Sequence, residues 1–132
     1  MPCVNFMRRF VPRILDGTKV HTIRIMGARP HRAGETLYMQ TGPRFKPDRF
    51  MTCPCLRVRE IVLHEETLTI WNENRKGFIV PPLDTFARAD GFDSWEDLQK
   101  FFEHPVAPAQ LVQWAPAEWE STIMMEERKC LP

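Results

Sequence analysis

Apolar residues recur at helical spacing near the start of the chain and mostly at strand spacing from residue 20 to residue 71. Phe6, Phe10 and Ile14 lie four residues apart, which is the spacing of one helix face. Pro12 confines the regular part of this helix to the residues after position 11, because proline suits a first turn and breaks an interior one. Gly17 predicts the end of the helix, since glycine readily adopts the left-handed conformation found after many helices.

Five segments have the alternation or the β-branched composition of strands. They cover residues 20–25, 36–40, 55–63, 67–71 and 110–114. The stretch 42–50 contains glycine, two prolines and three basic residues, and we expect a loop there.

After Pro81-Pro82 the pattern changes to that of two short helices. The first is expected over 85–90, capped by Asp84 and ended by Gly91. The second begins at Asp93 or Ser94, with an acidic residue in the capping-box position. Its apolar positions predict one face packed in the core, formed by Trp95, Leu98, Phe101 and Phe102.

This order of elements predicts an α+β fold: a small antiparallel or mixed β-barrel with helices packed on it. The chain has 132 residues, of which 43% are hydrophobic and 27% charged. Those values suit one globular domain and exclude a disordered tail, a coiled coil and a collagen-like repeat. We assign residues 1–116 to the domain. Residues 117–132 are charged and weakly periodic, which is typical of a tail or frayed helix.

The sequence composition also indicates where the protein is located and whether it holds a cofactor or a metal. The N-terminus lacks a charged region followed by an apolar run, and no apolar run approaches the ~20 residues that span a bilayer. The cysteines at positions 3, 53, 55 and 130 include a C-x-C pair, not the C-x₂-C of zinc knuckles. We therefore predict a cytoplasmic protein without membrane contact, cofactor or metal; a zinc site from the four cysteines is the alternative to free thiols.

The net charge of +1 conceals a strong asymmetry along the chain. Residues 1–60 have a balance of +8, and residues 61–132 have a balance of −7. The basic half contains a group of cations with aromatic residues between them: Arg24, Arg29, His31, Arg32, Arg44, Lys46 and Arg49, with Tyr38, Phe45 and Phe50. Such a group binds phosphates and stacks on bases. The alternative is a solvated basic face that pairs with the acidic half of the same domain.

The segment 17–24 contains the residues best suited to chemistry. On a strand over 20–25, Thr22 and Arg24 share one face and His21 lies on the other. Lys19, in the turn before the strand, is within reach of the Thr22 hydroxyl. A threonine nucleophile needs a base, and lysine serves only when desolvation or a cation such as Arg24 lowers its pKa. From spacing alone, a surface strand is the favoured alternative. His21 is expected to be a half-buried structural residue.

Four segments, in order, resemble the ASCH domain, a relative of the PUA RNA-binding domains. They are Ile14-Leu15-x-Gly17-x-Lys19-x-x-Thr22-Ile23-Arg24, Gly34-Glu35-x-Leu37, Cys55-Leu56-Arg57-Val58-Arg59-Glu60-Ile61, and Phe86-Ala87-x-Ala89-Asp90-Gly91-Phe92-x-Ser94-Trp95-x-x-Leu98-x-x-Phe101-Phe102. The first and the last are the more specific.

The resemblance implies a PUA-like β-barrel in which the first motif lines a cleft between barrel and helices. Small ASCH members are amidohydrolases that remove the acetyl group of N4-acetylcytidine, using a lysine and a threonine at K-x-x-T spacing and a later glutamate. Lys19 and Thr22 match the first two. The glutamate position falls on Asp90, which is one methylene shorter. Other members bind or cleave RNA.

We therefore expect a domain that binds RNA or a modified nucleoside in a basic cleft, with Arg24, Arg29, Arg32, Arg44 and Lys46 contacting phosphates. As an enzyme, Thr22 would attack an acyl carbon, with Lys19 as base and Asp90 as proton carrier or lysine partner. The alternatives are a non-catalytic RNA-binding module, an RNA-cleaving member of the family, and a protein-interaction domain that docks an acidic partner on its basic face.

Overall fold

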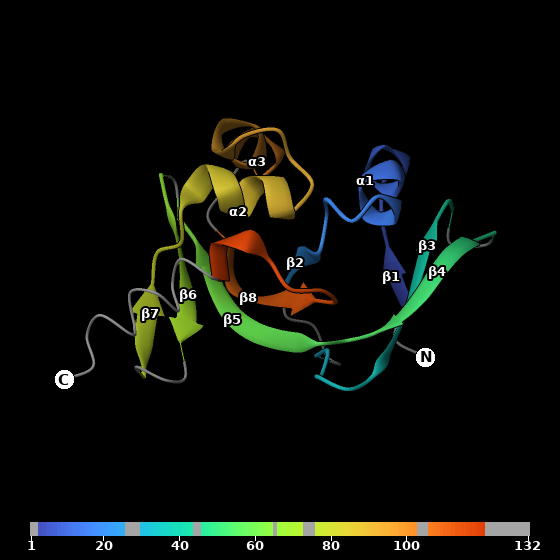
Figure 1. The fold of residues 1–132 in the computed structure, drawn as a ribbon, viewed down its shortest axis with the longest axis horizontal. Helices are drawn as coiled ribbons and strands as arrows, with labels where there is room; N and C mark the ends of the chain where they lie inside the picture. The colour runs from blue at the N-terminus through green and yellow to red at the C-terminus, as the bar shows by residue number, and fades with distance from the viewer. Residues whose placement is uncertain are drawn as a thin grey trace.

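A computed structural model describes residues 3–25, 30–43, 46–64, 66–72, 76–102 and 106–120. The elements are, in chain order, β1 (Cys3–Asn5), the 3₁₀ helix η1 (Arg8–Phe10), α1 (Val11–Leu15), β2 (His21–Ile25), β3 (Thr36–Thr41), β4 (Asp48–Pro54), β5 (Arg57–Leu63), β6 (Leu68–Asn72), β7 (Gly77–Ile79), α2 (Leu83–Ala89), α3 (Trp95–Phe101) and β8 (Val106–Gln113) (Figure 1).

The strands form two sheets, ordered β1-β3-β4 and β2-β8-β5-β6-β7. The pair β1–β3 is parallel, and the other recorded pairs are antiparallel. The α+β class expected from the sequence is confirmed. In the described part of the chain the strands form two sheets and do not close into a barrel.

The two sheets are joined by a short backbone bridge between β4 and β5. Cys55 N donates to Glu35 O at 2.7 Å and Gly34 N donates to Cys55 O at 2.8 Å, which ties the bridge to the start of β3. The next residue, Leu56, donates its N–H to Gln113 O of β8 at 2.8 Å. One stretch of chain therefore changes its hydrogen-bonding partner from the first sheet to the second, and β4 and β5 follow one curved path (Figure 1).

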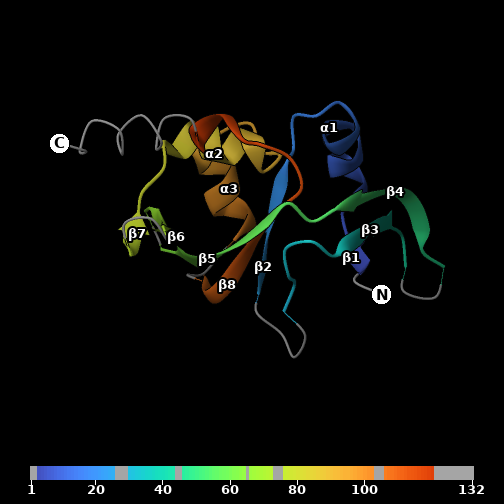
Figure 2. The ribbon, with the colours of Figure 1, turned by 60° about the horizontal axis from the view of Figure 1, so that its bottom comes forward.

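The helices lie on one side of the sheets, with α1 near the first sheet and the α2–α3 pair over the second (Figures 1 and 2). Phe86 of α2 is fully buried and stacks on the His21 ring of β2, with ring centroids 4.7 Å apart. Fully buried apolar side chains from both sheets and both later helices complete the core, including Leu37, Met39, Ile61, Leu68, Ile70, Leu98 and Leu111. In the described part of the chain, no helix has the length and apolar composition needed to cross a membrane.

Local sequence patterns predict most of the regular elements. The first helix begins at Val11 with proline in its first turn, and Gly17 after it has a φ of +89°. Ser94 caps α3 by accepting a hydrogen bond from Asp97 N at 3.3 Å. The expected cap of α2 is wrong: the helix begins two residues earlier than expected, at Leu83, so Pro82 is the N-cap and Asp84 lies in the first turn. The Asp84 carboxylate accepts from Trp95 N instead.

Three strands, β1, β4 and β7, are not predicted by the sequence pattern. Two of them have three residues each, too short to show a period. The third, β4, begins inside the expected loop at Asp48 and ends at Pro54. Its side chains are exposed or half-buried throughout, so its apolar alternation is short, limited to Met51 and Cys53.

The segment 117–132, expected to form a tail or a frayed helix, begins as part of the packed structure. Residues 118–120 are helical, and Ala117 and Trp119 are 6% and 1% exposed. The described domain therefore extends at least to residue 120, and residues 121–132 lie outside the described part.

Candidate functional site

The backbone around the start of β2 places Lys19 inside the protein. Lys19 N donates to Arg13 O at 2.9 Å, and Val20 N donates to Ala89 O of α2 at 2.8 Å. Trp114 N donates to Val20 O at 3.0 Å from the end of β8. These bonds fix the turn between α1, α2 and β8, and the Lys19 side chain is only 2% exposed.

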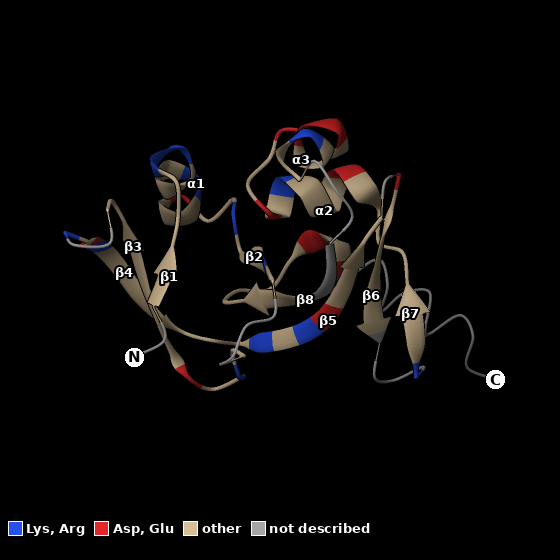
Figure 3. Ribbon diagram, turned by 180° about the vertical axis from the view of Figure 1, so that it is seen from behind, with Lys and Arg blue, Asp and Glu red and all other residues tan. Residues whose placement is uncertain are grey.

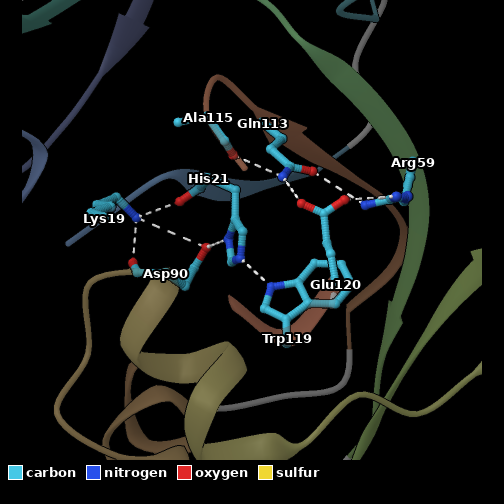
Figure 4. A network of polar contacts seen from close by, with 8 residues as sticks. All are labelled: Lys19, His21, Arg59, Asp90, Gln113, Ala115, Trp119 and Glu120. Atoms are coloured by element: carbon cyan, nitrogen blue, oxygen red, sulfur yellow. Dashed lines mark hydrogen bonds and ion pairs between the residues drawn. The ribbon is translucent and has the colours of Figure 1, made fainter. Parts of the chain in front are cut away.

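The Lys19 ammonium is held by oxygens of two residues (Figure 4). Its Nζ donates to His21 O at 3.0 Å and also to Asp90 O. The Asp90 carboxylate lies 3.9 Å from Nζ. The rings of Phe10 and Phe6 lie 4.9 and 5.7 Å from the same nitrogen. Three oxygen contacts and two aromatic rings thus surround a cation that water hardly reaches.

Burial lowers the pKa of Lys19 to about 8, against an ordinary value of 10.5. Desolvation is the main cause, because it penalises the charged form. Asp90 opposes the shift, while the positive charges of Arg24 and Arg9 add to it.

Asp90 also anchors a chain of hydrogen bonds through His21 to Trp119 (Figure 4). Asp90 is the C-cap of α2 and is 2% exposed. His21 Nδ1 lies 2.8 Å from Asp90 Oδ1, and Trp119 Nε1 donates to His21 Nε2 at 2.9 Å. An indole N–H only donates, so Nε2 must accept and the imidazole proton must be on Nδ1. His21 is therefore neutral, and burial lowers its pKa.

Gly91 lies against the stem of the lysine. Its φ is +96°, and a Cβ added there would come within 2.8 Å of Lys19 Cδ and 3.0 Å of Phe10 Cδ1. The residue after Asp90 thus needs both the left-handed conformation and the missing side chain. This close approach keeps the lysine, Phe10 and the end of α2 in one packed unit.

The structure brings Lys19 and Asp90 together but does not join Thr22 to them. Thr22 is paired with Val112 of β8 and is 7% exposed. In the described part of the chain no hydrogen bond links Thr22 to Lys19, whose Nζ is directed to the C-terminal end of α2. The lysine has other acceptors there, so it does not need the threonine hydroxyl as a partner.

Arg24 lies on the same strand face as Thr22 and has an unusual environment. Its guanidinium carbon is 5.1 Å from the centre of the Phe6 ring, and one terminal nitrogen donates to Asn5 O. Its Nε is buried and has no hydrogen-bond partner among the described residues. Burial lowers the pKa of Arg24.

A loop from the basic half is held next to Arg24. The cross-strand neighbour of Arg24 is Gln110 of β8. The Gln110 amide accepts from His31 N at 2.9 Å and donates to His31 O at 3.2 Å. This double contact fixes the loop that contains Arg32, which is exposed.

The other predicted cations have separate positions. Lys46 is exposed in the turn between β3 and β4. Arg49 lies 4.5 Å over the Tyr38 ring, as expected of interleaved cations and aromatics. Arg29 and Arg44 lie outside the described residues. Arginines also occur on η1, α1 and β5, and acidic residues occur around α2 and α3 (Figure 3).

Part of the charge asymmetry is neutralised inside the domain. The Glu120 carboxylate accepts from Arg57 Nη1 at 2.8 Å, from Arg59 Nη2 at 3.0 Å and from Ala117 N at 2.9 Å. It also accepts from Gln113 Nε2 (Figure 4). Arg57 and Arg59 share this one carboxylate, so internal pairing neutralises one of their two positive charges.

The sequence does not identify His21, Trp119 and Glu120 as members of a network. Alternation correctly places His21 on the face opposite Thr22. The expectation of a half-buried side chain is wrong, because His21 is 0% exposed. Trp119 and Glu120 fall in the segment expected to be a tail. The only signal for them is a tryptophan in an otherwise polar segment, which is more often packed than free.

The cysteines give no metal site among the described residues. Cys3 is exposed, Cys53 is half-buried and Cys55 is buried, and all three are free. Cys130 lies outside the described residues. In the described part of the chain, no cluster of three or more histidine, cysteine or acidic residues is placed to hold a metal ion.

Comparisons of the chain with protein-family models, with curated proteins and with solved structures found no match. The chemistry of the site therefore has to be judged from its geometry. Two features stand out: a buried lysine cation fixed against Asp90, and an arginine next to it with an unused donor.

Proposed function

We propose that this chain is a cytoplasmic ASCH-type domain that binds RNA or a modified nucleoside at the Arg24 face of β2. The four ASCH-like segments support the family assignment. They fall on the turn from α1 into β2, the start of β3, β5, and the α2–α3 pair. In a PUA-like arrangement, the two sheets would be the two halves of an incompletely closed barrel.

The observation that carries the binding proposal is the buried Arg24 Nε, which has no partner among the described residues. Leaving a buried donor unsatisfied costs about 1–3 kcal/mol, more when the group is charged. A phosphate or carbonyl oxygen of a ligand that displaces the atoms covering Nε would remove that cost. The Phe6 ring beneath the guanidinium holds it in one orientation, and arginine in a fixed plane suits phosphates and bases.

Lys19 supports this proposal as a fixed positive charge. Its Nζ and the Arg24 guanidinium lie 5.7 and 5.1 Å from the same ring, that of Phe6. Two cations on one ring attract an anion more strongly than either does alone. Lys19 is oriented by oxygens of the protein, so it contributes charge rather than a direct contact.

Binding is tested by fluorescence anisotropy with a labelled single-stranded RNA at two or more salt concentrations. We expect Arg24→Ala to weaken binding at least about tenfold and to reduce the salt dependence. Arg24→Lys keeps the charge but removes Nε, and should recover only part of the affinity. Arg8→Ala, which removes an exposed arginine from η1, is the matched control. Equal affinities for Arg24→Ala and Arg8→Ala would contradict the proposal.

A second candidate function is hydrolysis of an N4-acylated cytidine, which the lowered pKa of Lys19 favours. At a pKa of about 8, a substantial fraction of the lysine is neutral in mildly alkaline solution and able to accept a proton. Thr22 Oγ1 would then attack the acyl carbon, forming an ester while the cytosine N4 leaves with the proton from Lys19. Water would release the acid and restore Thr22. This route requires Lys19 to leave its carbonyl partners.

Hydrolysis is tested by incubating the protein with N4-acetylcytidine and separating cytidine from the substrate. We expect turnover to rise with pH through about 8, because the neutral lysine is the active form. Thr22→Val keeps the shape and removes the hydroxyl, so turnover should disappear. Thr52→Val, at an exposed position of β4, should leave it unchanged. Turnover that persists in Thr22→Val would rule out the threonine as nucleophile.

A further inference from the structure

A surface pocket of about 600 Å³ lies between the first helical segment and α3. Arg9, Phe10 and Arg13 line it from η1 and α1, while Asp97, Lys100 and Phe101 line it from α3. The turn 91–93 closes it between the two helices. Its size is within the range of small-molecule sites. The two walls come from the helices on one side of the molecule (Figures 1 and 2).

Arg9 lies on an aromatic floor in this pocket. Its guanidinium carbon is 4.6 Å from the centre of the Phe10 ring, 5.3 Å from Phe101 and 5.7 Å from Phe92. The three rings contact one another, with centroids 5.3 to 6.0 Å apart. In the described part of the chain, the N–H groups of Arg9 have no hydrogen-bond or ion-pair partner. The Arg9 guanidinium is planar and packs with one face on these rings. Its other face can stack on a flat ligand, and the N–H groups at its edge can donate hydrogen bonds.

Arg13 holds the α1 wall of the pocket against the turn 91–93. Its Nη1 donates to Gly91 O at 2.8 Å, and its Nη2 donates to the Asp93 carboxylate. The first contact ties α1 to the turn after α2, and the second pairs the charge of Arg13. The pocket is thus formed without a ligand, and Arg13 is not the cation that binds one.

The lining combines two available cations, Arg9 and Lys100, with two carboxylates, Asp97 and Asp93, of which Asp93 is paired with Arg13. Lys100 has a contact of 3.8 Å with Glu96, but both side chains are largely exposed, so this pair is weak and a ligand can replace it. Arg9 and Lys100 therefore attract an anion, whereas Asp97, which lines the pocket from the same helix, repels one. A ligand with an anionic group near Lys100 and N–H donors near Asp97 would suit both kinds of charge. A flat ring that bears those donors would also stack on Arg9. Nucleotides have this combination: a phosphate at one end and a stacking base at the other.

Guanine is the base that best matches a carboxylate. Its N1–H and N2–H groups are adjacent donors, and a carboxylate accepts two parallel hydrogen bonds. Adenine has the acceptor N1 next to its amino group. Its edge would therefore place one acceptor against the Asp97 carboxylate, which is unfavourable. Hydrogen bonds to a base edge are the usual source of such discrimination.

We propose that this pocket binds a guanine nucleotide, with the base stacked on Arg9, its edge on Asp97 and its phosphate near Lys100. The site shares no ligand-contacting residue with the Arg24 face of β2, so this proposal is independent of RNA or nucleoside binding at that face. Free guanosine monophosphate and a guanosine within RNA present the same chemistry, and the experiment separates them.

Isothermal titration calorimetry with the intact protein tests the ligand class. We expect guanosine monophosphate to bind about tenfold more tightly than adenosine monophosphate, and inorganic phosphate not to compete at equal concentration. A single-stranded oligouridylate with one internal guanosine is compared with plain oligouridylate. Tighter binding of the first identifies RNA as a source of the base, and equal binding of the two restricts the site to the free nucleotide. Equal affinity for the two monophosphates, or full competition by phosphate, would overturn the proposal.

Matched variants test the cation under the base. Arg9→Ala should weaken guanosine monophosphate binding at least about tenfold, whereas Arg8→Ala, on the same 3₁₀ turn and outside the pocket lining, should not. Arg24→Ala should leave this binding intact, so failure here and failure of the proposed function are separate results. Equal binding by Arg9→Ala and wild type would overturn the stacking arrangement.

A second pair of variants tests the carboxylate. Asp97→Asn should bring the affinities for the two monophosphates close together, because an amide no longer distinguishes the two base edges in the same way. Glu96→Gln, on the exposed side of α3, releases Lys100 for both nucleotides equally and should preserve the preference for guanine. An unchanged preference in Asp97→Asn would remove the carboxylate from the base-recognition site.

Discussion

The buried Lys19 ammonium makes a definite prediction about alkaline stability. Its pKa is about 8 in the folded protein and 10.5 when it is freely solvated. Below pH 8 the lysine is charged in both states, so its burial cost is fully present. Between these two pKa values it is neutral when folded and protonated when unfolded. The unfolded state then binds more protons, so the free energy of unfolding rises with pH over that interval.

The size of the effect follows from the shift. One pKa unit corresponds to about 1.4 kcal/mol, so lowering the value from 10.5 to about 8 corresponds to about 3 kcal/mol. Most of it should be regained by about pH 10. Burial raises the pKa values of the Cys53 and Cys55 thiols, which changes stability in the opposite direction at high pH. The lysine contribution must therefore be measured as a difference between two proteins that share these thiols.

Urea unfolding of the wild type and of Lys19→Met, at about pH 7.5, 8.5 and 9.5, provides that difference. Methionine is close in length and carries no charge, so its unfolding free energy lacks the lysine contribution. We expect the wild type to gain about 2 kcal/mol relative to Lys19→Met over this range. Lys46→Met, which removes an exposed lysine, controls for the loss of one positive charge. A constant difference between wild type and Lys19→Met would refute the lowered pKa.

Three further changes test the packing around the site by chemical or thermal unfolding. Gly91→Ala should cost about 2–4 kcal/mol, because the new methyl meets the lysine stem and Phe10; Gly34→Ala, also at positive φ but with open space around it, should cost about 1 kcal/mol. Trp119→Phe should cost about 1–3 kcal/mol, since the buried histidine nitrogen loses its donor; a loss below about 0.5 kcal/mol would argue against that bond. Burial alone would raise the pKa of Glu120, but its hydrogen bonds lower it overall, so stability should fall as acid protonates this carboxylate. Glu120→Gln should reduce that acid sensitivity and Glu118→Gln should not.

Local chemistry explains which elements can be predicted from the sequence. The helix ending before Gly17 and the strand from His21 are both encoded within a few residues, by a proline, a glycine and a β-branched run. In contrast, β4 has only a weak apolar face, with Phe50, Met51 and Cys53 half-buried against the core, and it pairs with β3 at every residue except Phe50. Backbone pairing with a neighbouring strand does not require a regular alternation of apolar residues. A strand held mainly by such pairing is therefore hard to recognise from its own sequence.

The same distinction applies to the site. The K-x-x-T spacing indicates Lys19, and the resemblance adds Asp90, which is 71 positions further along the chain. Neither indicates that the lysine donates to the backbone oxygens of His21 and Asp90 and makes no hydrogen bond with Thr22. Side-chain direction in a turn depends on what the rest of the fold brings near it.

The aromatic stripe of α3 illustrates a different difficulty. Helical spacing predicts that all four of its residues belong to the core. Leu98 is fully buried, but Phe101 remains 43% exposed and lines the pocket beside Arg9. Periodicity finds the apolar face of a helix and does not show how far the neighbouring element covers it.

The position of β8 constrains the order in which the chain folds. This strand lies between β2 and β5, and it pairs His21 with Gln113 across more than two-thirds of the sequence. During synthesis from the N-terminus, β2 and one edge of β5 have no partner in this sheet until the residues after 105 have been added. Contacts between such distant positions slow folding, and unpaired edges attract other strands. The strand β8 therefore has to enter between β2 and β5 after both have been made, and the Trp119 donor to His21 is added to the chain later still.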